Sequence, residues 1–244
     1  MDTPKQSTTP PERSAGVRIG RELLKATAPY AVESVGKSWW LVASTFVLLI
    51  LSMCGAALAP AWPLRLLFSL LTALLMVRAF ITYHDYMHGA ILARSRSAWL
   101  LFHVYSALAL TPPRSWRYSH NYHHGHVGQI SEAGIGAFPV MTTQMWQEAS
   151  RPARTRYRIV RHPLTVLTGY FTIFFLNITL LPLLTSPTRH WDSLLVLLGH
   201  AALVAVLWIF GGFDTALFAV LLPMTVASLL GSYLFFAQHS FKRM

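Results

Sequence analysis

Cysteine, acidic residues and charged residues in general are all scarce in this sequence. The single cysteine, Cys54, can form neither a disulfide within the chain nor a cysteine-based metal site, so any bound metal would need other ligands. Only 12% of the 244 residues are charged, whereas 54% are hydrophobic. The mean hydropathy is +0.44. This composition excludes an ordinary soluble domain and predicts a protein that crosses a membrane several times.

The shortage of acidic residues leaves the chain strongly basic. The sequence contains nine Asp and Glu residues and 20 Lys and Arg residues, which gives a formal net charge of +11. The basic residues flank the hydrophobic segments, as is typical of loops on the cytoplasmic side of a membrane, and we therefore expect no nucleic-acid partner. Residues 1–37 are polar and basic and are predicted to form a cytoplasmic tail. Residues 38–244 are predicted to form one membrane domain.

Two early apolar segments are long enough to cross a membrane as helices. Residues 39–58 carry no charge. Residues 64–83 carry only Arg65 and Arg78, whose long side chains can reach toward the membrane surfaces. Residues 99–110 are apolar but too short to cross, so they predict a helix that lies in the membrane interface.

The last three apolar segments cannot all cross if every histidine cluster lies on one side. Residues 193–210 and 215–236 are joined by a short turn without basic residues and are predicted to form a transmembrane hairpin. Residues 164–184 contain Pro182 and are predicted to be re-entrant or interfacial. The expected fold is thus all-α: a polytopic membrane protein with about four transmembrane helices, additional interfacial or re-entrant helices and a cytoplasmic histidine-rich cap.

Two groups of histidines lie beside these segments. His84 and His88 are four residues apart, so their rings share one face of a helix. His120, His123 and His124 have a spacing that turns two rings to one side and leaves the third for a neighbouring ion. Imidazole is the commonest protein ligand for transition metals. The pattern favours a metal site at the membrane surface over a metal-free, hydrogen-bonded surface.

Other residues near these groups have less specific roles. No Glu-x-x-His sequence occurs, which excludes the carboxylate-rich site of four-helix di-iron bundles. Asp85 and Glu132 are candidates to orient the histidine rings, although Asp85 is equally well explained as a charge at a helix end. His126 and His190 are expected to be a loop histidine and an interfacial histidine. His200 lies within a span and is expected to be a neutral ring bonded to a neighbouring helix.

These motifs resemble those of integral-membrane fatty acid desaturases, close to the bacterial acyl-lipid type. The first motif of that family, His-Asp-x-x-His-Gly, is matched by His84, Asp85, His88 and Gly89. The second, His-x-x-His-His, is matched by His120, His123 and His124. A Gln-His-x-Phe motif after the last span is matched by Gln238, His239 and Phe241. The resemblance runs from about residue 40 onward.

The resemblance implies an oxidoreductase that introduces a double bond into an acyl chain. Its substrate would be an acyl lipid or an acyl chain on a carrier. The implied cofactors are two non-haem iron ions, with dioxygen as co-substrate, and a separate electron donor of the ferredoxin or cytochrome b5 type. The implied location is the bacterial inner membrane, with the histidine motifs on the cytoplasmic side. The implied metal ligands are His84, His88, His120, His123, His124 and His239.

The sequence departs from the family in two ways. Tyr86 and Met87 stand between the histidines of the first motif, where the family has small residues. The family also has a third histidine cluster downstream of the Gln-His motif, and the present sequence ends shortly after His239. This predicts a desaturase that is truncated at its C-terminus, or a catalytically inactive homologue. A carotenoid ketolase or hydroxylase of the same superfamily is the other enzyme hypothesis.

Overall fold

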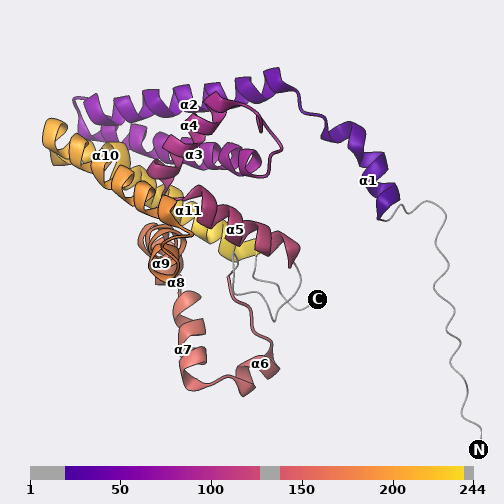
Figure 1. Cartoon of the computed structure of the whole chain (residues 1–244). Helices are drawn as coiled ribbons and strands as arrows, with labels where there is room; N and C mark the ends of the chain where they lie inside the picture. The colour runs from indigo at the N-terminus through magenta and orange to yellow at the C-terminus, as the bar shows by residue number, and fades with distance from the viewer. Residues whose placement is uncertain (1–19, 127–137, 239–244) are drawn as a thin grey trace, which may run out of the picture. The chain divides into compact units, whose positions relative to one another are not determined.

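The computed structural model describes residues 20–126 and 138–238 of the chain (Figure 1). Every regular element within these two segments is a helix. The all-α prediction is therefore confirmed. The chain divides into two compact units at Ser34, and each unit is treated by itself below.

The described part of the first unit contains two short helices. They are α1 (Arg21–Thr27) and the single 3-10 turn η1 (Ala28–Ala31), which begins just before Pro29. Neither helix contains a buried residue. The predicted tail thus includes helical turns, and the next helix, α2, already begins at Val35, inside the segment predicted as tail.

Three helices in the described part of the chain are long and apolar enough to cross a membrane, so the prediction of a membrane protein is confirmed. The first two are α2 (Val35–Leu58) and α3 (Trp62–Met87). They lie side by side in Figure 1 and share the largest contact between elements. Buried polar groups on the two helices satisfy each other, since the hydroxyl of Thr72 donates to Oγ of Ser52 at 3.0 Å.

The third apolar stretch extends over 48 residues, Trp191–Gln238. It consists of α10 (Trp191–Ala216), the π-helical η3 (Leu217–Leu221) and α11 (Leu222–Gln238). Gly212 interrupts it with φ 82° and ψ 168°, a backbone conformation that is open to glycine almost alone. Both the start and the end of the stretch contact helix α5 (Pro113–Gly125), so the two arms run antiparallel. The predicted reversal is confirmed, and the count of four crossings stays a prediction.

Shorter helices complete the second unit. They are α4 (Arg96–Ala109), α6 (Thr143–Glu148), α7 (Arg151–Val160), α8 (Pro163–Leu167), the π-helical η2 (Tyr170–Leu180) and α9 (Leu181–Thr185). The apolar helix formed by η2 and α9 is too short to count as a candidate span, in line with its predicted role. Its re-entrant placement stays a prediction.

Side chains anchor this short apolar helix to the rest of the unit. Thr179 donates to the carbonyl oxygen of Leu110 at 2.9 Å. Pro182 has no N–H to offer the carbonyl of Ile178 four residues earlier, and the hydroxyl of Ser115 donates to that carbonyl at 3.1 Å. The carbonyl that Pro182 leaves open thus attaches η2 to the first turn of α5.

An aromatic core joins α3, α4 and the start of α5. The rings of Tyr83, Phe102 and Trp116 are almost fully buried, and Tyr83 lies within 6.1 Å of both of the others. The buried hydroxyl of Tyr83 donates to the carbonyl of Thr111 at 2.8 Å, and that of Tyr105 donates to the carbonyl of Met76 at 2.7 Å. These contacts fix the C-terminal end of α3 against the N-terminal end of α5.

Candidate metal centre

The end of α3 presents the first histidine pair. His84 lies in the last turn of α3, and His88 caps the helix, with its N–H donating to the carbonyl of His84 at 3.1 Å. Gly89 follows with φ 72°, which ends the helix directly after the pair. The two rings are one helical turn apart, and their centroids are 4.5 Å from each other.

Helix α5 supplies the second pair from one of its faces. Trp116, His120 and His124 follow one another at intervals of four residues, so they lie along the same side of the helix. The Trp116 indole stacks on the His120 ring with a centroid distance of 4.2 Å and an interplanar angle of 23°. Because Trp116 is itself buried in the aromatic core, it fixes the plane of the His120 ring.

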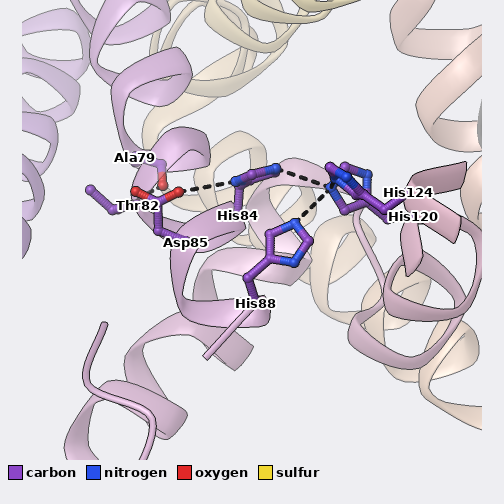
Figure 2. A network of polar contacts seen from close by, with 7 residues as sticks. All are labelled: Ala79, Thr82, His84, Asp85, His88, His120 and His124. Carbon is purple, nitrogen blue, oxygen red and sulfur yellow. Dashed lines mark hydrogen bonds and ion pairs between the residues drawn. The ribbon is translucent and has the colours of Figure 1, made fainter. Parts of the chain in front are cut away.

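The four rings point toward one another (Figure 2). Nε2 of His120 lies 3.0 Å from Nε2 of each of the other three histidines, His84, His88 and His124. A single imidazole nitrogen carries either one proton or one lone pair, so hydrogen bonding among the rings cannot satisfy three such contacts at once. The ligand atoms of all four lie within 4.8 Å of one another.

This arrangement fits a metal ion. Imidazole nitrogens bind a divalent metal at about 2.1 Å, and at right angles around it two such nitrogens would stand about 3.0 Å apart. The measured separations match that spacing. The donors are neutral nitrogens, which suits a borderline transition metal such as iron and does not suit magnesium or calcium.

The surroundings of His88 and His120 favour the uncharged form of these two rings. Burial, and after it the charge repulsion of the neighbouring histidine rings, together lower the pKa of His120 to about 3. Burial also lowers the pKa of His88, with repulsion from His84 and His124 as the next causes. Since a histidine must be neutral to bind a metal, these shifts keep the Nε2 lone pairs available at physiological pH.

Asp85 contacts the first of these rings from outside the group. Its Oδ1 lies 3.1 Å from Nδ1 of His84 (Figure 2). When Nδ1–H donates to this carboxylate, the proton occupies Nδ1 and the lone pair of Nε2 faces the other histidines. This is the geometry expected of a ring-orienting acid. Glu132, the other candidate for that role, lies outside the described residues.

Four of the six histidines proposed as ligands come together, and His123, the remaining described one, does not join them. The ring of His123 lies 6.1 Å from that of Phe235 on α11, and its centroid is 6.4 Å from that of His120. His239 lies outside the described residues. His126, expected as a loop histidine, donates from Nδ1–H to the carbonyl of Tyr122 at 2.8 Å, and its ring stacks on that residue.

Two further histidines are buried away from this group. Nε2 of His200 lies 2.6 Å from the hydroxyl of Tyr170, and Nδ1 lies 3.1 Å from the carbonyl of Ala107, which confirms the expectation of a ring bonded to neighbouring helices. His190 is only 7% exposed within the protein and lies against Tyr118, and its expected place in the membrane interface stays a prediction. No local sequence pattern indicates this burial, because it depends on packing against α5.

The fold and the site together define a class: a helical membrane protein whose histidines gather where α3 ends beside α5. A model of the fatty acid desaturase family matches residues 60–244, and the chain belongs to this family. A fatty acid desaturase of Bacillus subtilis (strain 168) is 23% identical over 225 residues, which are 91% of this chain and 64% of that protein. The chain thus spans less than two thirds of the length of this relative. No solved structure matches the chain.

Proposed function

We propose that the protein is an oxygen-dependent di-iron desaturase that introduces a double bond into the acyl chain of a membrane lipid. The observation that carries this proposal is the convergence of four Nε2 atoms, three of them at 3.0 Å from the fourth, which hydrogen bonding among the rings cannot explain. Family membership and the relative from Bacillus subtilis, named a fatty acid desaturase, support the type of reaction.

The residues of the cluster have distinct parts in this proposal. His84, His88, His120 and His124 would hold one iron, and His123 and His239 would contribute to the second. Bound iron would supply the activation of dioxygen, which is reduced to two water molecules by two electrons and two protons together with one hydrogen from each of two adjacent methylenes. Asp85 holds the proton on Nδ1 of His84. Trp116 keeps the ring of His120 in place and shields one of its faces from water.

The remaining features of the proposal concern the cellular setting. The electrons would come from a separate ferredoxin or cytochrome b5 type protein. We place the membrane domain, residues 38–244, in the bacterial inner membrane, with the tail of residues 1–37 and the histidines on the cytoplasmic side. The arginines of α7 and of the residue after it support this side under the positive-inside rule: Arg151, Arg154, Arg156, Arg158 and Arg161.

The proposal is tested by expressing the chain in a bacterial host that lacks its own desaturase. Gas chromatography of the fatty acids and iron analysis of the purified protein are the readouts. The wild type should produce new unsaturated fatty acids, and His120→Ala should produce none and lose iron. His103→Ala is the matched control, because the exposed ring of His103 on α4 contacts Trp99 and lies outside the cluster.

Each other outcome assigns the chain differently. Unsaturated products at wild-type level from His120→Ala would contradict the proposed site. A wild-type protein that binds no iron and makes no product would identify an inactive homologue. Altered carotenoids with unchanged fatty acids, in a host that supplies both, would identify a ketolase or hydroxylase.

A further inference from the structure

A second candidate site lies on the side of α5 that faces away from the histidine cluster. Arg114, Tyr118 and Asn121 follow one another at helical spacing, two residues out of step with Trp116 and His120, which places them on the opposite face. They line a cavity of about 630 Å³ together with Arg117, Arg189 and His190. The volume is in the range of sites that bind small molecules.

Three arginines give this cavity a concentrated positive charge. Among the described residues, none of Arg114, Arg117 and Arg189 forms an ion pair with a carboxylate. One nearby acid, Asp192, accepts a hydrogen bond at 2.8 Å from the backbone N–H of Arg114 and is itself buried, so it offsets only part of this charge. Three guanidinium groups around one cavity, with only part of their charge offset, favour an anionic ligand.

Aromatic rings hold two of these guanidinium groups in place. Cζ of Arg114 lies 5.2 Å from the centre of the Trp191 ring, and Cζ of Arg189 lies 4.6 Å from that of Tyr118. Stacking uses the flat face of a guanidinium and leaves its N–H edge for a ligand. That edge matches the paired oxygens of a phosphate or a carboxylate, so the side chains are arranged for such a group before it binds.

A buried polar side chain also lines the cavity without a partner. His190 is 7% exposed, and its buried Nδ1 makes no hydrogen bond within the described structure. A buried nitrogen without a partner is costly, and an oxygen of a bound ligand would remove that cost. The position of the cavity indicates the source of the ligand. Arg189 and His190 directly precede Trp191, where a candidate membrane span begins, so we expect the cavity at the depth of lipid headgroups.

We propose that this cavity binds the phosphate group of an anionic lipid headgroup, at a site separate from the histidine cluster. The proposal does not depend on desaturase activity, because none of the residues that line the cavity is a proposed metal ligand. It commits to the lipid as the source of the phosphate, since the cavity is much larger than one phosphate ion and adjoins a span.

The test measures binding to the full-length chain in neutral detergent by native mass spectrometry. The added probes are phosphatidylglycerol, diacylglycerol, which lacks the phosphate, and inorganic phosphate. We expect phosphatidylglycerol to saturate at one molecule per chain and diacylglycerol not to bind. In the double variant Arg114→Gln/Arg117→Gln the affinity for phosphatidylglycerol should fall about tenfold or more, as expected for the loss of charge-assisted hydrogen bonds.

The matched control is Arg154→Gln/Arg158→Gln. This pair removes the same charge from α7, where both guanidinium groups stack on Trp146 outside the cavity. Its affinity should stay within about twofold of the wild type. The single variant Arg189→Gln, on the loop before α10, repeats the test with a smaller change if the double variant does not fold.

Three results would overturn the proposal. One is equal weakening in the cavity pair and the control pair, which would show attraction to net charge only. Another is binding of inorganic phosphate without binding of phosphatidylglycerol, which would show that a free anion is the ligand. The third is the absence of saturable binding to the wild type. Desaturase activity and iron content take no part in these readouts, so this proposal and the proposed function fail separately.

Discussion

His120 and His200 are both held inside the helical assembly, but their ring nitrogens have opposite surroundings. Both nitrogens of His200 face ordinary partners, the hydroxyl of Tyr170 and the carbonyl of Ala107. Nε2 of His120 faces three other imidazole nitrogens, and at most one of them can hydrogen-bond to it. In a structural histidine each ring nitrogen therefore has a hydrogen-bond partner. In a candidate metal ligand the ring nitrogens of several histidines meet, and they carry too few protons to hydrogen-bond to one another.

The largest expected effect tests the ligand side of this contrast. His124→Ala removes one of the four converging nitrogens and leaves the iron with three donor atoms from this group. Both bound iron and unsaturated product should therefore fall to background. Iron analysis and gas chromatography are the measurements. His126→Ala, at the residue that follows α5 and outside the cluster, should behave as the wild type. Equal losses in both variants would mean that the end of α5 matters only for folding.

The next effect separates the two roles open to Asp85. If its carboxylate orients His84, then Asp85→Asn should weaken iron affinity about 10- to 100-fold, as outer partners of metal ligands commonly do. Iron affinity is measured by competition with a chelator. Asp214→Asn, at the reversal between α10 and α11, is the control for loss of one acid. A variant that keeps its iron affinity but melts at a lower temperature would assign Asp85 to the helix end.

A smaller effect is expected on the structural side of the contrast. His200→Phe removes the hydrogen bonds to Tyr170 and Ala107 and leaves their polar groups buried, which should cost about 1–3 kcal/mol of stability. Thermal unfolding followed by circular dichroism measures the change. The iron content should equal that of the wild type. Loss of iron with unchanged stability would place His200 among the functional residues.

The smallest effect is a pH dependence of the metal-free chain. The pKa of His120 is lowered from 6.5 to about 3 in the folded state, so the unfolded chain binds its proton first as the pH falls. Stability should therefore be full above about pH 6.5 and decline as the pH drops toward 3. His120→Asn should show a shallower decline in melting temperature over this window. The same slope in both proteins would assign the acid sensitivity to other groups.

The sequence was sufficient for features that depend on neighbouring residues. The charge-free run of residues 39–58 predicted a span now seen within α2, and the four-residue spacing of His84 and His88 predicted two rings on one face. The reversal before α11 followed from Gly211 and Gly212, since glycine adopts backbone conformations closed to other residues.

Features that depend on packing between distant segments could not be read in this way. The spacing of the second motif allowed His123 as well as His124 to face α3, and the choice depends on Trp116 on one side and Phe235 on the other. The burial of His190 depends likewise on α5, which lies far away in the sequence. Periodicity within one segment contains no information about such partners.

The reversal at Gly212 has a consequence for how the protein is made. The two arms that it joins begin and finish beside α5, the first through Asp192 and the second through Phe235. During synthesis α5 leaves the ribosome well before the second arm, so its contact with Phe235 must wait until α11 has been made. The packing around the second histidine motif thus forms late. A chain released by a ribosome that stalls before the second arm would have the contact of α5 with Asp192 but not the contact with Phe235.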